Sequence, residues 1–425
     1  MQKPDNHIEN IKAIKAARFP ELNLPAELIH PWYTGFSLLN LPSTVASILG
    51  CPELPHQSLE NPFLQSSSDI TQVIVCLLDG LSFSRFQNWI QNHPLQNRLV
   101  EDGFIQALTS VIPSTTCSVL TTLWTGRSPA EHAILGYELF LKEIGIVTNM
   151  ISHSPIMMPH EQGLLYKAGF DPETATNGRT LGTLFSQYGI STYAFLNKYI
   201  KHSGLSRMHY ADVQAAGFSS LPEMWINLRT LVEKRPSRRR FIWAYYAGID
   251  TMSHHRSPDS EYTRAEFDLF IRTMEEHFLK PFSGSNNHTL LLLTADHGQI
   301  STPKDPVFDL SNHPDLLQLL HLYPTGENRL TFLHIRPGQV NAVKQYFHKT
   351  WGDTFVLLDS HQLLDQGFFG PGNPSPASAD RIGDLVGIGT GNSYLWWGDR
   401  PNPLEGRHGG LSSDEMIVPL AGFLI

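Results

Sequence analysis

The sequence has few cysteines and no apolar run of membrane-spanning length. Its three cysteines, Cys51, Cys76 and Cys117, lie far apart and form no CxxC pair. A low, odd number of cysteines suits a reducing compartment. The first residues contain no apolar segment like that of a secretory signal peptide, and no stretch approaches the ~20 uninterrupted apolar residues of a membrane span. We therefore expect a cytoplasmic protein without a membrane partner.

Basic residues are also not in excess. The chain has 31 Lys plus Arg against 40 Asp plus Glu, which gives a formal net charge of −9. This balance argues against duplex nucleic acid as the main partner, because gripping a duplex requires a basic face. An anionic small molecule stays compatible with the charge, since bound divalent ions can reverse the sign of a small pocket.

What the chain has is length. Its 425 residues, 41% of them hydrophobic, can bury a core that needs neither metal nor disulfide to fold. Any metal ligands are therefore free to serve chemistry.

Three apolar runs are each followed by an acidic residue. They are QVIVCLLDG ending at Asp79-Gly80, FIWAYYAGID ending at Asp250, and TLLLLTADHG, which contains Asp296. Helix-like patterns follow the first two runs, and this alternation predicts a doubly wound α/β fold with a mostly parallel central sheet flanked by helices. In such sheets ligands bind beyond the carboxyl ends of the strands, where we expect all three acids to lie.

The chain divides into three regions by pattern. Residues 1–70 are irregular and rich in proline, and we expect an N-terminal arm packed on the core. Residues 71–425 form the predicted catalytic domain. Within it, residues from about 324 to 370 contain a strand–helix–strand pattern, which predicts a small inserted α+β cap subdomain.

Imidazoles and carboxylates of the kind that bind divalent ions occur in four places, the first of which is Asp79. Asp250 and His254 are spaced by four residues, so a helix would put both on one face. His297 follows Asp296 at a strand end, and His408 precedes two glycines that allow close backbone approach. Taken singly, each of these features is also typical of an ordinary polar turn or strand terminus.

Hydroxyl side chains occur in VIPSTTCSVLTTLWTG (111–126), where a helical pattern follows two threonines. A hydroxyl at a helix N-terminus faces free backbone N–H groups, which suits a phosphate group. The alternative is an ordinary N-cap.

In their order along the chain, these segments resemble the alkaline phosphatase superfamily, and most closely its nucleotide pyrophosphatase/phosphodiesterase branch. The resemblance rests on LLDG, IPSTT, EHAILGY, DxxxH, ADHG and RHGG, and it spans roughly residues 71–425. It implies two divalent ions, with zinc favoured and manganese or iron as alternatives. It divides the ligands into two sets, which are Asp250, His254 and His408 for one ion and Asp79, Asp296, His297 and the nucleophile hydroxyl for the other.

The resemblance also implies the nucleophile. The branch uses the second Thr of a Phe-Pro-Thr-x-Thr segment, which places the nucleophile at Thr116, with Thr115 as the fallback. Where the branch has an Asn that binds a phosphoryl oxygen, this chain has Tyr137, which we take as a substrate-binding residue. The Cys-x-Pro-x-Arg segment of the related sulfatases has no counterpart at Cys117, which argues against a sulfatase.

The predicted function is metal-dependent hydrolysis of a small phosphate ester or nucleotide, at a phosphodiester or pyrophosphate bond. A phosphomonoesterase or phosphonate hydrolase is the first alternative, because the same site supports those reactions. A catalytically silent metal-binding scaffold is the second, and the presence of a nucleophile argues against it.

Overall fold

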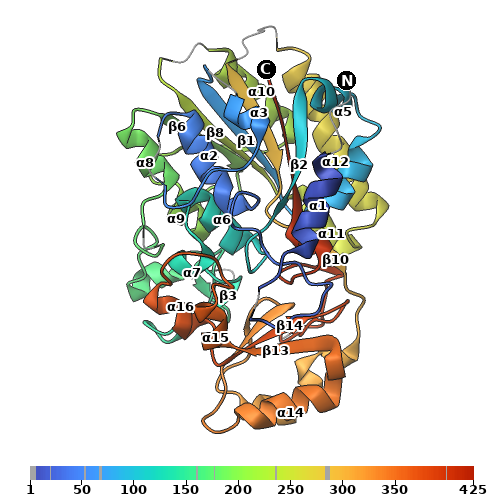
Figure 1. The fold of residues 1–425 in the computed structure, drawn as a ribbon. Helices are drawn as coiled ribbons and strands as arrows, with labels where there is room; N and C mark the ends of the chain where they lie inside the picture. The colour runs from blue at the N-terminus through green and yellow to red at the C-terminus, as the bar shows by residue number, and fades with distance from the viewer. Residues whose placement is uncertain are drawn as a thin grey trace.

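The computed structural model describes residues 6–425 except 20, 52–53, 67–68, 159–160, 177, 235–236, 283–287 and 399. Its main feature is a seven-stranded sheet that occupies the upper half of the molecule in Figure 1. The strands, in spatial order, are β2 (Gly103–Thr109), β16 (Ile417–Leu424), β9 (Thr289–Thr294), β1 (Gln72–Leu78), β8 (Arg240–Tyr246), β6 (Ser191–Asn197) and β7 (Gln214–Phe218).

The sheet is mostly parallel. Strand β1 pairs in parallel with β8 on one side and β9 on the other, and β6 continues the parallel order. Only β16 runs antiparallel to its two neighbours. All seven residues of β1 are buried, as expected for a strand covered on both faces. The predicted α/β class and its mostly parallel sheet are therefore confirmed.

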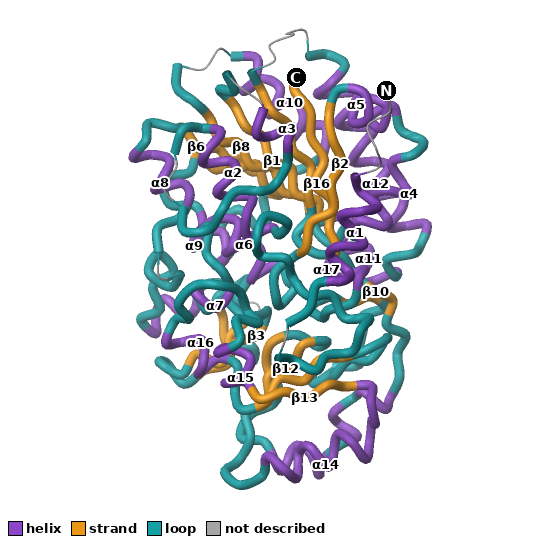
Figure 2. Tube along the Cα trace, in the orientation of Figure 1, coloured by secondary structure: helices purple, strands orange, loops and turns teal. Residues whose placement is uncertain are grey.

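Helices cover both faces of this sheet (Figures 1 and 2). One face carries α2 (Leu41–Ile48), α6 (Thr116–Thr125), α8 (Leu181–Gln187) and α9 (Gly204–His209). The other carries α4 (Phe83–Ile90), α5 (Pro94–Glu101), α10 (Leu221–Glu233), α11 (Gly248–Arg256) and α12 (Glu261–Met274). The core lies between the sheet and these helices.

A second sheet of seven strands lies below the first. Its strands pair antiparallel throughout. In spatial order they are β13 (Phe355–Asp359), β14 (Leu385–Gly389), β12 (Leu330–Leu333), β11 (Thr325–Gly326), β3 (Glu138–Leu141), β4 (Ile146–Asn149) and β5 (Ser154–Pro155). Two distant stretches of chain build it, because β3 to β5 come from residues 138–155.

The segment predicted as a cap contributes only part of this second sheet. Its strands are β11, β12 and β13, and helix α14 (Val340–Trp351) lies outermost in Figure 1. A separate apolar cluster packs under α14 and includes Phe347 and Trp351. The division of the chain into domains stays a prediction.

The remaining elements are short. They are α7 (Pro129–His132), α13 (Pro314–Leu319), α15 (Ser360–Asp365), α16 (Pro376–Arg381), α17 (Ser413–Met416) and the ribbon of β10 (Ile300–Ser301) with β15 (Gly406–Arg407). Near the N-terminus lie α1 (Asn6–Ala16) and α3 (Pro62–Ser66); α1 contacts β2 of the main sheet. Among the described residues, no helix combines the length and apolarity needed to cross a bilayer.

Candidate active site

The predicted metal ligands all lie beyond the carboxyl ends of the central strands. Asp79 directly follows β1, and Asp296 follows β9, its neighbour in the sheet. One prediction needs correction here. Strand β8 ends at Tyr246, and Asp250 lies in the first turn of α11 instead of at a strand end, because the chain has already left the sheet and begun a helix at Gly248.

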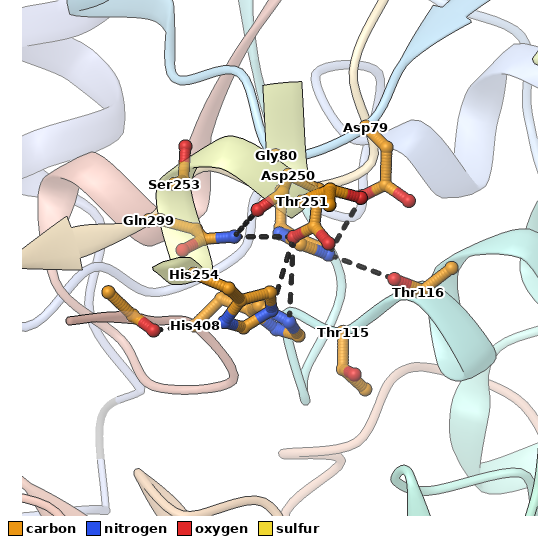
Figure 3. A network of polar contacts seen from close by, with 12 residues as sticks. Asp79, Gly80, Thr115, Thr116, Asp250, Thr251, Ser253, His254, Gln299 and His408 are labelled. Atoms are coloured by element: carbon orange, nitrogen blue, oxygen red, sulfur yellow. Dashed lines mark hydrogen bonds and ion pairs between the residues drawn. The ribbon is translucent and has the colours of Figure 1, made fainter. Parts of the chain in front are cut away.

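The helix places Asp250 and His254 on one face, as their four-residue spacing allows. His254 Nε2 lies 3.4 Å from Asp250 Oδ1. His408 follows β15, and its Nε2 lies 3.9 Å from the same oxygen. The rings of His254 and His408 are 5.1 Å apart between centroids, and Figure 3 shows them meeting at Asp250.

The remaining ligands gather around His297. Its Nε2 is 3.4 Å from Asp79 Oδ1 and 3.5 Å from Asp296 Oδ2. Its ring stacks on that of His408 with 3.8 Å between centroids. The structure thus brings all six predicted side chains together, and His297 lies at the junction of two possible metal-binding groups, Asp250–His297–His408 and Asp79–Asp296–His297. Which side chain holds which ion stays a prediction.

All three imidazoles are oriented in the same way. Nδ1 of His254 lies 2.9 Å from the carbonyl oxygen of Gly406, Nδ1 of His297 lies 3.1 Å from that of Gly298, and Nδ1 of His408 lies 3.2 Å from that of Ser114. A carbonyl oxygen only accepts, so Nδ1 carries the proton and donates it. Each Nε2 is left with a free lone pair toward the cluster, which is the arrangement that metal-binding histidines use.

The electrostatics of the site favour a cation. Burial raises the pKa of Asp79, and the neighbouring carboxylates of Asp296 and Asp250 raise it further. Burial also raises the pKa of Asp296. Burial lowers the pKa of His408 well below its usual value, and the neighbouring His297 and His254 add to this effect. Buried carboxylates that lie this close together need a positive charge to compensate them.

The residues present fit a pair of divalent ions. Asp79 Oδ1 and Asp296 Oδ2 are buried and have no hydrogen-bond partner among the described residues. A buried carboxylate oxygen without a donor is costly, and a metal ion would satisfy both atoms. The donor set of imidazole nitrogens and carboxylate oxygens matches zinc and tolerates manganese or iron.

The two predicted hydroxyls have different surroundings. Thr116 is the first residue of α6, and its Oγ1 lies 3.2 Å from His297 Nε2. Thr115 instead donates its hydroxyl to Glu327 Oε1 at 2.6 Å. In Figure 3, Thr116 lies on the side of Asp79 while Thr115 lies apart from the cluster. The geometry therefore places the hydroxyl of Thr116, and not that of Thr115, beside the cluster.

Tyr137 lies in the loop before β3 and lines a cavity of about 500 Å³ that also contains Thr116, Asp250 and His408. The side chain is 38% exposed. Burial of the hydroxyl and the nearby Glu138 raise the pKa of Tyr137 to about 12. The phenol therefore stays neutral at physiological pH and can donate a hydrogen bond.

Two residues that the sequence did not predict donate hydrogen bonds to the predicted ligands. Tyr245, on β8, donates its hydroxyl to Asp79 Oδ2. Gln299 donates its side-chain amide to Asp250 Oδ1, and its backbone carbonyl accepts a hydrogen bond of 2.8 Å from Arg85. Gln299 directly follows the ADHG segment, so its place in the sequence was a usable signal. Tyr245 is one of several aromatic residues in the apolar strand β8, so the sequence contained no signal for its contact with Asp79.

Known structures with a similar fold include phosphate- and phosphonate-processing enzymes. An inactive variant of murine ectonucleotide pyrophosphatase/phosphodiesterase 5 in complex with AMP is 13% identical, with a TM-score of 0.59 over 82% of this chain and 87% of that one. The human protein of that name gives 13% identity, a TM-score of 0.58 and the same coverage. Phosphonoacetate hydrolase from Sinorhizobium meliloti in complex with phosphonoacetate is 19% identical, with a TM-score of 0.59 over 83% of this chain and 90% of that one.

At these identities the structural matches establish the fold alone. No curated protein matches the chain in sequence. The sequence profile of type I phosphodiesterases and nucleotide pyrophosphatases, however, matches residues 73–410, which includes every predicted metal ligand and Thr116. The chain belongs to the type I phosphodiesterase/nucleotide pyrophosphatase family, within the alkaline phosphatase superfamily.

Proposed function

We propose that this protein hydrolyses phosphodiester or pyrophosphate bonds, with Thr116 as the nucleophile and two divalent ions, preferably zinc. The observation that carries the proposal is the position of Thr116 Oγ1 beside a cluster of three imidazoles and three carboxylates, of which Asp79, Asp296 and His297 are buried. Manganese or iron would suit the same donor set.

The reaction would proceed in two displacements. Thr116 Oγ loses its proton to solvent and attacks phosphorus, while the ester P–O bond breaks and the departing oxygen takes up a proton. Water then cleaves the new Thr116 Oγ–P bond and releases the product. Divalent ions, when bound, favour the ionised hydroxyl and stabilise the developing negative charge. The chain itself contributes the free N–H groups at the start of α6 and the neutral phenol of Tyr137 as a donor to a phosphoryl oxygen.

The cavity makes the two enzymatic alternatives weaker candidates. A phosphomonoester carries an additional anionic oxygen, and phosphonoacetate carries a carboxylate. The cavity wall contains the carboxyl groups of Glu138 and Glu327, and a negative charge on this wall would disfavour a substrate with an additional anionic group. A diester with one uncharged or cationic arm avoids that repulsion.

The test compares bis(p-nitrophenyl) phosphate with p-nitrophenyl phosphate, using enzyme loaded with zinc or manganese. The proposal expects a higher kcat/KM for the diester. A preference for the monoester would overturn it in favour of the phosphomonoesterase. If the protein hydrolyses neither ester, and no pyrophosphate or phosphonate either, the catalytically silent metal-binding scaffold becomes the favoured function.

A further inference from the structure

A buried ion pair connects the two sheets close to the predicted metal ligands. It consists of Arg329, which directly precedes β12 of the second sheet, and Glu415, in the short helix α17 that leads into β16 of the main sheet. In Figure 2, α17 lies between the main sheet and β12. Both side chains are 0% exposed, and no other arginine or lysine ion pair among the described residues is as completely buried.

The pair has a fixed geometry. The guanidinium of Arg329 donates to both carboxylate oxygens of Glu415, from Nε to Oε1 at 2.7 Å and from Nη2 to Oε2 at 3.0 Å. It also donates to the backbone carbonyl oxygens of Ser393 and Gly389. A guanidinium fork of this kind holds a carboxylate in one orientation. The second sheet therefore sets the orientation of Glu415.

The carboxylate of Glu415 in turn holds the segment that follows His408. Its Oε1 accepts the backbone N–H of Gly410 at 2.9 Å, and its Oε2 accepts that of Ser412 at 3.1 Å. Gly410 lies two residues after His408 in the chain. The ion pair thus reaches a predicted metal ligand through one short stretch of backbone.

The same stretch is joined to the segment that carries the nucleophile. Ser114 donates its hydroxyl to the carbonyl oxygen of Gly410 at 2.8 Å, and its own carbonyl oxygen accepts the Nδ1–H of His408 at 3.2 Å. Ser114 lies two residues before Thr116. A displacement of Gly410 would therefore change the orientation of the His408 ring.

Two glycines of the sequence motifs are explained by close approach to this pair. A Cβ at Gly410 would lie 2.9 Å from both carboxylate oxygens of Glu415 and 3.2 Å from Nε of Arg329. Gly298 donates its N–H to the backbone carbonyl of Glu415 at 2.9 Å, and a Cβ there would lie 2.0 Å from the carbonyl oxygen of Asp414. The second glycine of RHGG and the glycine of ADHG thus let the backbone contact α17 directly.

Stability alone does not account for the pair. Removing two charges from water costs about as much as their attraction returns, so replacing a buried ion pair with apolar side chains often leaves stability unchanged or raises it. What a fully buried pair can supply is one defined arrangement of the chain around it. Here that arrangement is the path of the backbone after His408.

We propose that Arg329 and Glu415 are positioning residues that hold His408 in the orientation its metal ion requires, and that they act through the backbone of Gly410. The inference rests on the proposed function, because it takes His408 as a metal ligand. Neither Arg329 nor Glu415 lines the cavity, so their effect reaches the reaction through the ligand and not through the substrate.

The test is a calorimetric zinc titration of the metal-free protein. The variant is Arg329→Met/Glu415→Gln, which removes both charges at once and so leaves no unpaired buried charge. We expect one of two zinc-binding events to weaken by about tenfold or more, as for other hydrogen bonds behind metal ligands, and the other event to keep its wild-type affinity. The stoichiometry of the unaffected event gives the fraction of folded protein in the same sample. Unchanged affinity in both events, or an equal loss in both, would overturn the proposal.

The control is Arg381→Met/Glu143→Gln. Arg381 is also buried, and it donates to Glu143 at 3.0 Å and to the carbonyl oxygen of Ala133, not to the segments that carry the metal ligands. This variant should keep both zinc-binding events. A loss of the same size in the control would show that zinc affinity follows the fold as a whole, which would refute a specific role of Arg329 and Glu415.

A second measurement asks whether the pair acts through His408. In His408→Ala the imidazole that the pair positions is absent, so adding Arg329→Met/Glu415→Gln should weaken zinc binding by less than about twofold further. A further loss as large as the one in the wild-type background would place the effect at another ligand and overturn the proposal.

The titration also separates this inference from the proposed function. Two zinc-binding events in the wild type that both persist in Arg329→Met/Glu415→Gln would refute the positioning role and keep the metal site. Failure of the wild-type protein to bind zinc or manganese would refute the metal site, and the positioning role with it.

Discussion

The metal end of the cavity, which contains the predicted metal ligands, and its acidic wall, which contains Glu138 and Glu327, come from different parts of the fold. At the metal end, Asp79 and Asp296 leave neighbouring strands of the main parallel sheet at the same edge. The acidic wall comes from the antiparallel second sheet and its loops, with Glu138 on β3, Glu327 after β11 and Trp397 far along the chain. A variant in one of these parts should therefore leave the structure of the other intact.

Replacing the nucleophile should have the largest effect. We expect Thr116→Ala to lower kcat by at least ~10³-fold, since losing a nucleophile removes most of the chemistry. Its metal content should stay near that of the wild type, because the six predicted ligand side chains remain in place. Kinetics and metal analysis of the same sample check this. Thr115→Ala is the matched control; if it loses as much activity while Thr116→Ala stays active, the assignment of the nucleophile is wrong.

Removing the metals separates chemistry from folding. Chelation should abolish activity, and activity should return on adding zinc or manganese. A cooperative unfolding transition should persist, with a lower Tm because bound ions stabilise the folded state, since the core is large enough to stand alone. Differential scanning calorimetry with and without chelator measures both transitions. Disappearance of the transition on chelation would mean that the metal end holds the fold together.

Variants of Gln299 and Tyr245, which donate hydrogen bonds to the predicted ligands, should affect the metal end alone. Gln299→Leu removes the amide donor from Asp250, and Tyr245→Phe removes the hydroxyl donor from Asp79. Outer hydrogen bonds of this kind typically change metal affinity ~10–100-fold, so each variant should weaken one of two binding events in a zinc titration. Weakening of both events equally would show that the two groups act as one site.

The smallest effect concerns Glu327 of the acidic wall, in protein without metal or substrate. Burial raises the pKa of Glu327 to about 8 in the folded protein, above its value in an unfolded chain. The folded state therefore holds this proton more tightly, and the resulting stability is present at low pH and lost as pH rises through about 8. Glu327→Gln removes that loss. Relative to wild type, its apo-protein should gain about 2 °C in Tm between pH 5 and pH 8.5; equal pH dependence would contradict the raised pKa.

The sequence predicted the metal end far better than the acidic wall, for a physical reason. In a parallel sheet the carboxyl ends of strands meet at one edge, so a short motif after each apolar run is enough to predict convergence. Asp79 and Asp296 are residues of this kind. Asp250 was expected at a strand end and lies on a helix, but its four-residue spacing from His254 fits a helix equally well.

Glu327 and Trp397 had no such signal. Each becomes part of the cavity only because β11 pairs with β3 and because the loop carrying Trp397 returns to Glu138. Antiparallel pairing between residues 138–155 and 325–389 depends on long-range packing, which no local pattern specifies. The family resemblance did not supply it either, because its motifs cover the metal ligands and the nucleophile.

The central claim is that two cations bind side by side next to Thr116, and anomalous X-ray diffraction from zinc-soaked crystals tests it most directly. The account predicts two peaks at the zinc edge about 4 Å apart, one touching Asp250, His254 and His408 and the other touching Asp79, Asp296 and His297. A single peak, or peaks away from these side chains, would contradict it.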